Sequence, residues 1–378
     1  MARTTGNASD LITFTRASTG TFLGSNGLLQ TAAINTPRVE YDANGVAKGL
    51  LIEEARTNLV LNSEAPGNIY GTYTVNSTTS PLGSVSAALL QPTGSGLKGW
   101  APYYTGFSAN TDYTLSVFIK AKELSQIAIN LLSTSGPTFD ALTGQLTSGT
   151  GTITDVGNGW YRCTAVHQTN AGGVLDVRLL ILDNFGNSSY TSNGTDGIYI
   201  WGFQVEQGSF PTSYIPTSGA TATRSADIAS VSVSEFGYNQ AQGSVVVECQ
   251  SLQTTAANPM AYQLNDGTVS NRITVFGSGG GWRFVTTTSG TAQADINISS
   301  SFNSGSFNKI ASSFAANQFN HVVNGESGVE DVSGSLPTIT TLSLGTQILT
   351  NQINGHIKSI NYYPLRLSDA KLQELTSS

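Results

Sequence analysis

The stretch Ile198–Asp227, IYIWGFQVEQGSFPTSYIPTSGATATRSAD, decides the fold. Its first half alternates: one face of an extended chain carries Tyr199, Trp201, Phe203 and Val205, and the opposite face carries Ile200, Gly202, Gln204 and Glu206. This period of two predicts a strand that packs on a core. Pro211 and Pro216 end that strand. The stretch therefore closes one β-domain and leads into a second.

The composition favours an all-β architecture. At 378 residues the chain is long enough for two or three domains. Charged residues make up only 11%, against about 25% in an average globular protein. Ser, Thr, Asn and 41 glycines take their place. This exchange favours short strands with tight turns, because Glu, Lys and Ala are the residues that build surface helices.

Charge and cysteine content exclude several classes of protein. Seventeen basic against 24 acidic residues give a formal charge of −7, and no basic run is present, so nucleic-acid binding is disfavoured. Cys163 and Cys249 fall in different expected domains and are expected to be buried thiols rather than a disulfide. We expect no signal peptide and no membrane insertion, since the N-terminus lacks an apolar core and no apolar stretch is long enough.

The strand pattern predicts two tandem jelly-roll or β-sandwich domains behind an N-terminal arm of short strands. The expected divisions are an attachment or oligomerisation arm (1–48), a jelly roll (49–224), a linker (225–241) and a second sandwich (242–378). Asn158-Gly159 predicts a two-residue hairpin turn, because both positions tolerate a positive φ. Ser368 is a good N-cap for one C-terminal helix, in which Leu367 can pack on Leu372.

Three segments carry a family resemblance. In their residues and in their order along the chain, they resemble a carbohydrate-binding-module-like jelly roll of tailed-phage virion proteins. The three segments are GLLIEEARTNLVLNSE at 49–64, NGWYRCTAV at 158–166 and the stretch at 198–227. The resemblance covers about the first three-fifths of the chain. It implies a protein on the surface of a phage particle, released by lysis, that contacts host cell-surface polysaccharide.

Two further segments add weaker resemblances. Residues 11–42 are similar to the openings of phage virion proteins, which implies pairing with other virion proteins or a homo-oligomer; the alternative is that these strands cover an edge of the following domain. Residues 308–325 and 355–378 resemble the central hairpin and the ending of laminin-G and concanavalin-like sandwiches.

The sequence predicts no catalytic residue, no cofactor and no metal ligand set. It contains no G-x-S-x-G, H-E-x-x-H, Walker A or Rossmann pattern. A pair of carboxylates for glycoside hydrolysis remains open, because spatial pairing cannot be read from a sequence. Oxygen donors crowd residues 183–196, and calcium prefers such donors, but turn formation by Asn and Asp explains the cluster equally well.

Aromatic residues supply the candidate binding site. Sugar rings pack their C–H faces on aromatic planes while amides and hydroxyls bond the sugar OH groups. Trp100, Tyr103 and Tyr104 lie in GLKGWAPYYTGF, where strand patterning is interrupted, and Trp282 follows GSGGG. These four residues are the expected carbohydrate-binding residues, with burial in a core as the alternative for both tryptophans.

We therefore expect a non-enzymatic virion protein, such as a tail fibre, tail tip or head fibre, that binds host glycans. One alternative is a capsid or tail decoration that binds only virion proteins, and another is a polysaccharide-degrading enzyme.

Overall fold

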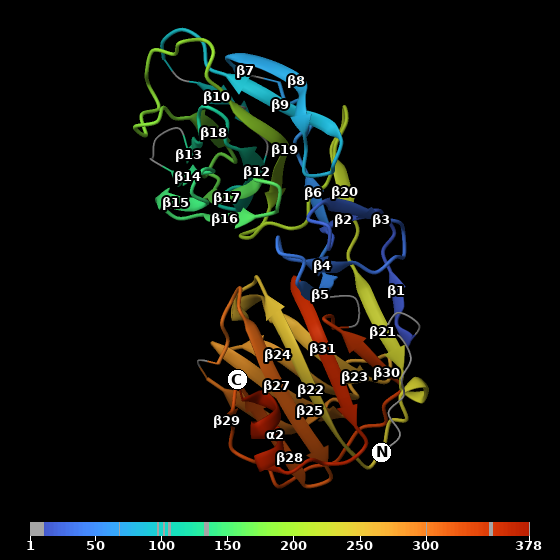
Figure 1. Cartoon of the computed structure of the whole chain (residues 1–378). Helices are drawn as coiled ribbons and strands as arrows, with labels where there is room; N and C mark the ends of the chain where they lie inside the picture. The colour runs from blue at the N-terminus through green and yellow to red at the C-terminus, as the bar shows by residue number, and fades with distance from the viewer. Residues whose placement is uncertain are drawn as a thin grey trace.

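The computed structural model describes residues 11–377 except 68, 97, 101–102, 105–106, 132–135, 300 and 348–350. The all-β prediction is confirmed: four large antiparallel sheets form two stacked lobes (Figure 1). Among the described residues, the helical elements are α2 (Asp369–Thr376) and two 3-10 turns, η1 (Val233–Glu235) and η2 (Thr255–Ala257).

The first lobe is a sandwich of two sheets. One sheet has the order β15-β14-β13-β18-β10-β7, with β11 also pairing with β18. Its strands are β7 (Ile69–Tyr70), β10 (Gly99–Trp100), β11 (Tyr103–Tyr104), β13 (Gln126–Leu131), β14 (Thr138–Asp140), β15 (Gln145–Ser148) and β18 (Leu175–Ile181). The other sheet has the order β16-β17-β12-β19-β9-β8. Its strands are β8 (Thr72–Thr79), β9 (Val85–Gln91), β12 (Asp112–Lys120), β16 (Thr152–Asp155), β17 (Tyr161–Gln168) and β19 (Ile198–Gln207).

The strand β19 forms where it was expected, but its two faces differ from the prediction. Its register with β12 shifts between Ser116 and Phe118, and Gly202 takes a φ of 65°. The extra residue of a β-bulge reverses the alternation of side chains. Phe203 and Val205 consequently share the sandwich core with Ile200, whereas Tyr199 and Trp201 pack on the opposite face.

The second lobe is also a sandwich, and N-terminal strands complete both of its sheets. One has the order β1-β21-β30-β23-β24-β25-β26, and the other β29-β28-β27-β22-β31-β5-β4. The strands of the first are β1 (Thr13–Thr15), β21 (Ile228–Ser232), β23 (Met260–Asn265), β24 (Arg272–Ser278), β25 (Gly281–Thr288), β26 (Thr291–Ile298) and β30 (Thr341–Leu344). Those of the second are β4 (Val39–Tyr41), β5 (Ala47–Ile52), β22 (Gln242–Ser251), β27 (Phe307–Ala315), β28 (Gln318–Val323), β29 (Glu326–Ser327) and β31 (Gly355–Tyr363).

The expected arm and linker are therefore integrated into the second lobe. Thr13 pairs with Ser230, and Leu51 pairs with His356, so β1 and β5 are strands of this sandwich. The expected boundary at 48/49 falls inside β5, and the expected linker contains β21. Local periodicity detects short strands but not their partners, because those partners lie hundreds of residues away.

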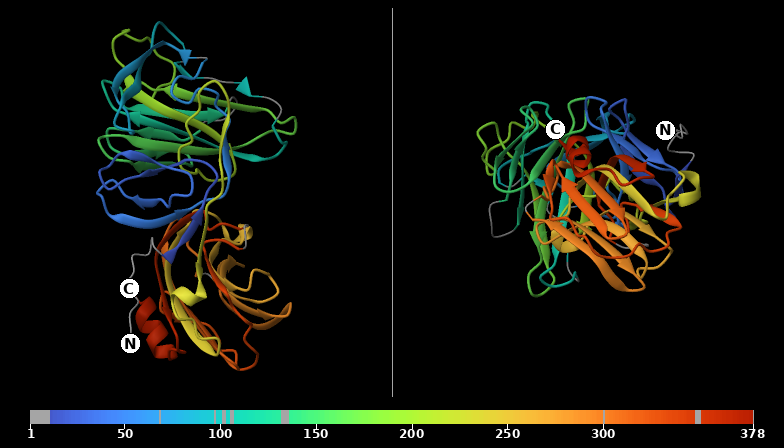
Figure 2. Two further views of the ribbon diagram at one scale, coloured as in Figure 1. Left: turned by 90° about the vertical axis from the view of Figure 1, so that its right-hand side faces the viewer. Right: turned by 90° about the horizontal axis from the view of Figure 1, so that it is seen from below.

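Two small sheets join the lobes. The hairpin of β2 (Gly20–Leu23) and β3 (Leu29–Ala32) packs Leu23 and Leu29 against Trp160 and Trp201 of the first lobe. The strands β6 (Arg56–Asn58) and β20 (Ala222–Arg224) pair beside it. Figure 2 shows the N-terminal strands among them, in blue, at the waist between the two lobes.

Several local predictions are confirmed. Asn158 and Gly159 take φ values of 56° and 76° in the turn closed by a hydrogen bond from the Trp160 N–H to the Gly157 carbonyl. The Ser368 side chain accepts a hydrogen bond from the Lys371 N–H at the start of α2. Both cysteines are buried free thiols.

Candidate functional site

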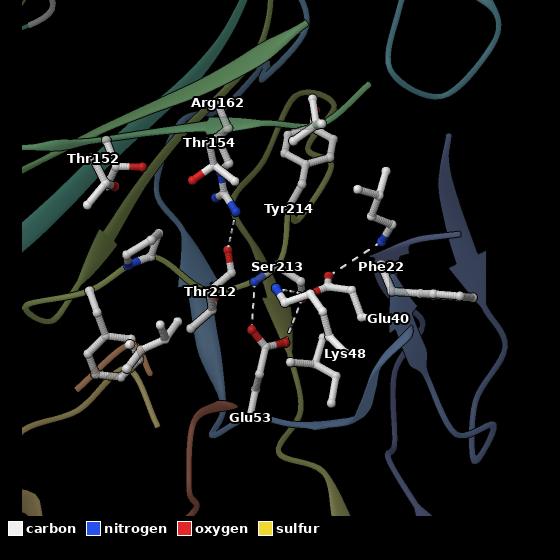
Figure 3. Close-up of a pocket in the computed structure, with 18 of the residues that line it drawn as sticks. Phe22, Glu40, Lys48, Glu53, Thr152, Thr154, Arg162, Thr212, Ser213 and Tyr214 are labelled. Atoms are coloured by element: carbon white, nitrogen blue, oxygen red, sulfur yellow. Dashed lines mark hydrogen bonds and ion pairs between the residues drawn. The ribbon is translucent and has the colours of Figure 1, made fainter. Parts of the chain in front are cut away.

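A cleft of about 780 Å³ opens between the two lobes and is lined by residues of β4, β5, β16 and β17. Figure 1 shows where these strands lie in the two lobes. Its size falls in the range of sites that hold small molecules or short oligomers, about 300–1,000 Å³. Figure 3 shows Thr152, Thr154 and Arg162 on one wall and Glu40 and Glu53 on the other. The segment 209–214, which follows β19, lies between the walls, and loops of the second lobe form the rim.

The first wall is the outward face of β16 and β17. Thr152 pairs with Thr164, and Thr154 pairs with Arg162, so these four side chains lie side by side. The residues between them, including Cys163, point into the sandwich core. Because side chains alternate along a strand, burying one set presents the other to the cleft. The result is a wall rich in threonine hydroxyls, with Thr152 and Thr154 exposed.

The second wall contains a paired charge cluster. The Glu40 carboxylate lies 3.0 Å from Lys48 Nζ and 2.7 Å from His356 Nε2. His356 Nδ1 lies 3.0 Å from Gln250 Oε1. Burial raises the pKa of Glu40, but hydrogen bonds and charges from His356 and Lys48 outweigh it and hold the pKa well below its usual range. Glu40 is thus an ionised carboxylate that forms an ion pair with Lys48 and a hydrogen bond with His356.

A buried ionic network supports the base of the cleft. The Glu53 carboxylate accepts hydrogen bonds from the Ser213 N–H and hydroxyl, both at 2.7 Å, and lies 2.8 Å from Arg38. Burial raises the pKa of Glu53, but the charges of Arg224 and Arg38 and the bonds from Ser213 lower it to about 2. This network fixes the segment 209–214 against the waist of the molecule.

The other two carboxylates of the lining support turns. Asp42 Oδ1 accepts the backbone N–H groups of Asn44 and Val46, each at 2.9 Å. Asp155 Oδ1 accepts the N–H of Gly157 at 2.8 Å. Each of the four lining carboxylates is thus engaged in an ion pair or a turn.

The cleft therefore combines hydroxyl groups with apolar surface. Phe22 and Tyr41 are half-buried on the side of β2 and β4, and Leu252 and Val166 are exposed on opposite lobes. Hydroxyls can donate and accept hydrogen bonds, and apolar faces can cover C–H groups. This arrangement suits a polar ligand with apolar patches.

The two tryptophans expected in the binding site are core residues, which corrects that prediction. Trp100 is 1% exposed and packs against Phe203 at a ring distance of 4.8 Å. Trp282 is 0% exposed and packs against Phe302 at 4.9 Å. The neighbouring glycines suggested open loops, but Gly99 and Gly281 belong to paired strands. Neither ring presents a face to solvent, so neither can be a stacking platform.

The two tyrosines lie outside the residues whose side chains are described. The backbone of Tyr103 and Tyr104 forms β11, which pairs with β18. Their expected role in carbohydrate binding therefore stays a prediction.

Sequence reasoning missed the residues that form the cleft. Glu40 and His356 are 316 positions apart, and Thr152 lies on a strand edge without any motif. The one available signal is the alternation of Thr and apolar residues in β16, a pattern typical of a half-exposed strand.

The acidic loop considered for calcium is held together by its own hydrogen bonds. Asp183 Oδ1 accepts the N–H groups of Phe185 at 2.9 Å and Asn187 at 2.8 Å. This is the turn-forming role of Asp that the sequence suggested. Within the described residues, no group of three or more His, Cys, Asp or Glu side chains is placed to hold a metal ion.

Comparisons with known proteins report similarity only at the level of structure. The sequence matches no protein-family model and no curated protein. Domain 4 of AbnA, a GH43 extracellular arabinanase from Geobacillus stearothermophilus solved with arabinotriose, is similar at 13% identity, with 45% of this chain and 82% of that chain covered and a TM-score of 0.34.

Two other solved structures show the same degree of similarity. The CBM40 of the Ruminococcus gnavus IT-sialidase, bound to alpha2,3 sialyllactose, shares 16% identity over 37% of this chain and 84% of its own, with a TM-score of 0.32. Mouse laminin alpha1 domains LG4-5 share 13% identity over 83% of this chain and 92% of their own, with a TM-score of 0.28. These scores are too low to transfer a ligand, and the neighbours give no indication of a phage origin. The sandwich fold is assigned from the sheet order described above.

Within the described part of the chain, no helix has the length and apolarity needed to cross a membrane.

Proposed function

We propose that this protein binds carbohydrate in the cleft between its lobes and serves as a non-enzymatic adhesion protein on the surface of a tailed phage or phage-like particle. The observation that carries the binding part is the cleft itself, with its wall of threonine hydroxyls facing half-buried aromatic and apolar side chains. The virion part is supported by the sequence resemblance of residues 49–64, 158–166 and 198–227.

The states of the cleft carboxylates favour binding over cleavage. Glycoside hydrolysis needs one carboxylic acid that stays protonated near neutral pH, which requires a raised pKa. The pKa of Glu40 and that of Glu53 are both lowered by cationic neighbours. Asp42 and Asp155 accept backbone hydrogen bonds that hold turns. Neither Glu40 nor Glu53 is placed in the environment that a general acid requires.

The open cleft sets the expected affinity. A shallow site with one or two apolar contacts and a few hydrogen bonds gives millimolar dissociation constants, roughly −4 kcal/mol. Adhesion then depends on several copies facing a repeating polymer, because each further contact becomes effectively intramolecular. Binding must therefore be measured both on the free protein by ligand-observed NMR and on multivalent protein by retention on immobilised polysaccharide.

The decisive variant removes hydroxyls from the wall without changing its shape. Replacing Thr152 and Thr154 together by valine should lower retention at least fivefold. The matched control makes the same two valine substitutions at Thr72 and Thr74, which are exposed on β8 at the other edge of the same sheet. Equal retention by both double variants would exclude the cleft as the site.

The virion role is tested separately. Particles that lack the protein should adsorb less well to host cells and to their isolated surface polysaccharide. Normal adsorption by such particles, together with antibody labelling on a capsid lattice, would favour the decoration alternative.

A further inference from the structure

The charged side chains that line the cleft are mostly paired, and carboxylates outnumber cations among them. Among the described lining residues, the anionic groups are Glu40, Asp42, Glu53 and Asp155, and the cationic groups are Lys48 and Arg162, with His356 the one titratable imidazole. Glu53 is compensated by the buried guanidinium groups of Arg38 and Arg224. The other three carboxylates against the two fixed cations give a formal lining charge of −1 when the imidazole is neutral. The cleft is therefore slightly anionic, like the whole chain at −7.

Neither fixed cation is directed at a ligand. Lys48 Nζ lies 3.0 Å from the Glu40 carboxylate. Arg162 donates from Nη1 to the Thr212 carbonyl at 2.8 Å and from Nη2 to the Ser116 hydroxyl at 2.7 Å. Figure 3 shows the Arg162 guanidinium turned toward Thr212. The guanidinium also lies over the Phe118 ring, 5.4 Å from its centre.

An acidic sugar would gain little in such a site. Its carboxylate would lose water without meeting an available cation, and the surplus lining carboxylates would repel it. A neutral sugar loses only hydroxyl hydration, which the threonine hydroxyls can replace. Unpaired charge is a standard means of rejecting one ligand in favour of another.

We infer that the cleft selects uncharged carbohydrate and rejects acidic carbohydrate, such as polymers of uronic or sialic acid, because Glu40 sequesters Lys48 and His356 and the remaining carboxylates leave the lining anionic. This inference rests on the proposed function. It names the substrate class of the same site and makes Glu40 a specificity-determining residue.

The test compares the full-length protein on three kinds of immobilised polysaccharide of matched length. The probes are a panel of neutral polymers (dextran, mannan and arabinan), two acidic polymers (polygalacturonate and polysialic acid) and one cationic polymer (chitosan). At least one neutral polymer should be retained ten times better than either acidic polymer at physiological salt. Preferential retention of an acidic polymer, or of chitosan, would overturn the inference and leave carbohydrate binding intact. Retention of none of the probes would instead count against the proposed function.

The charge mechanism is tested by Glu40→Gln, which keeps the side-chain shape and releases Lys48 and His356. This variant should retain acidic polymer at least threefold better than wild type at low salt, with the gain lost at 0.5 M salt. The control is Glu330→Gln, which breaks an ion pair with Arg366 outside the cleft. An unchanged preference in Glu40→Gln would refute the role of Glu40.

A second variant tests the same charge mechanism in case Glu40→Gln does not fold. Asp155→Asn removes one charge from the exposed rim, and an asparagine oxygen can still accept the Gly157 N–H. It should also raise acidic retention, by about twofold. If this variant folds and shows no change, the charge mechanism is wrong.

Discussion

Arg16 and Asp227 are 211 positions apart, yet Arg16 Nη1 donates to Asp227 Oδ1 over 3.1 Å, and both side chains are fully buried. Arg38 pairs with the other oxygen of the same carboxylate. Asp227 also accepts the Glu53 N–H at 2.9 Å. This carboxylate thus joins the N-terminal strands, the segment after β5 and the start of the second lobe.

Asp227→Ala should strongly destabilise the protein. Removing the carboxylate leaves the guanidinium groups of Arg16 and Arg38 buried without it, and breaking a buried pair in this way costs about 3–5 kcal/mol. Urea unfolding followed by fluorescence measures the loss. The control is Glu330→Ala at the exposed pair with Arg366, where about 0–1 kcal/mol is expected. Similar values for both variants would show that the network adds no stability.

A chain that begins at Gly49 should fail to form a stable second lobe. The deletion removes β1 and β4, the first residues of β5, and both Arg16 and Arg38. It removes the core residue Phe14 together with β1, and it exposes the edges of β21 and of the remaining part of β5. Hydrogen exchange at the amides of these two strands should accelerate. Unchanged protection in this deletion would mean that the arm is dispensable for folding.

Trp100→Ala should lower stability by about 3–5 kcal/mol, because it removes a large aromatic side chain from a packed core. Thermal unfolding measures this effect. Phe185, which is 90% exposed, is the matched aromatic control, and Phe185→Ala should change stability by no more than about 0.5 kcal/mol. A Trp100→Ala protein with wild-type stability would contradict the burial of this ring.

The free energy of unfolding should fall with decreasing pH over two overlapping pH ranges. Burial lowers the pKa of His321 to about 4, despite its hydrogen bond to the Trp282 carbonyl. The unfolded chain therefore takes up this proton first, and up to about 3 kcal/mol is lost between the ordinary value of 6.5 and pH 4. The pKa of Glu53 is lowered to about 2, so its stabilisation disappears as the pH falls from about 4.5 toward 2.

His321→Gln separates these two pH ranges. The variant is expected to flatten the dependence of unfolding free energy on pH between 6.5 and 4, whatever its absolute stability. Urea titrations at several pH values measure the slope. An unaltered slope would assign the acid sensitivity to another group.

The sequence by itself determined the local features. Low charge with abundant Gly, Ser and Thr specified an all-β chain, because these residues favour strands and turns over helices. Asn158 and Gly159 specified their turn, since both positions need a positive φ. Ser368 and Leu372 specified the C-terminal helix through its cap and its buried face.

Only the tertiary structure decided which faces and segments meet. The bulge at Gly202 reverses the alternation of β19, and a glycine inside a strand signals such a bulge without showing its effect on the register. Trp100 proved to be a core residue because pairing with β18 and β7 buries it, and neither partner is visible in the neighbouring sequence. The cleft joins Glu40, Thr152, Ser213 and His356 from distant segments. Local periodicity specifies that a strand forms, but its partner is chosen by long-range packing and by buried charges such as Arg16 and Asp227.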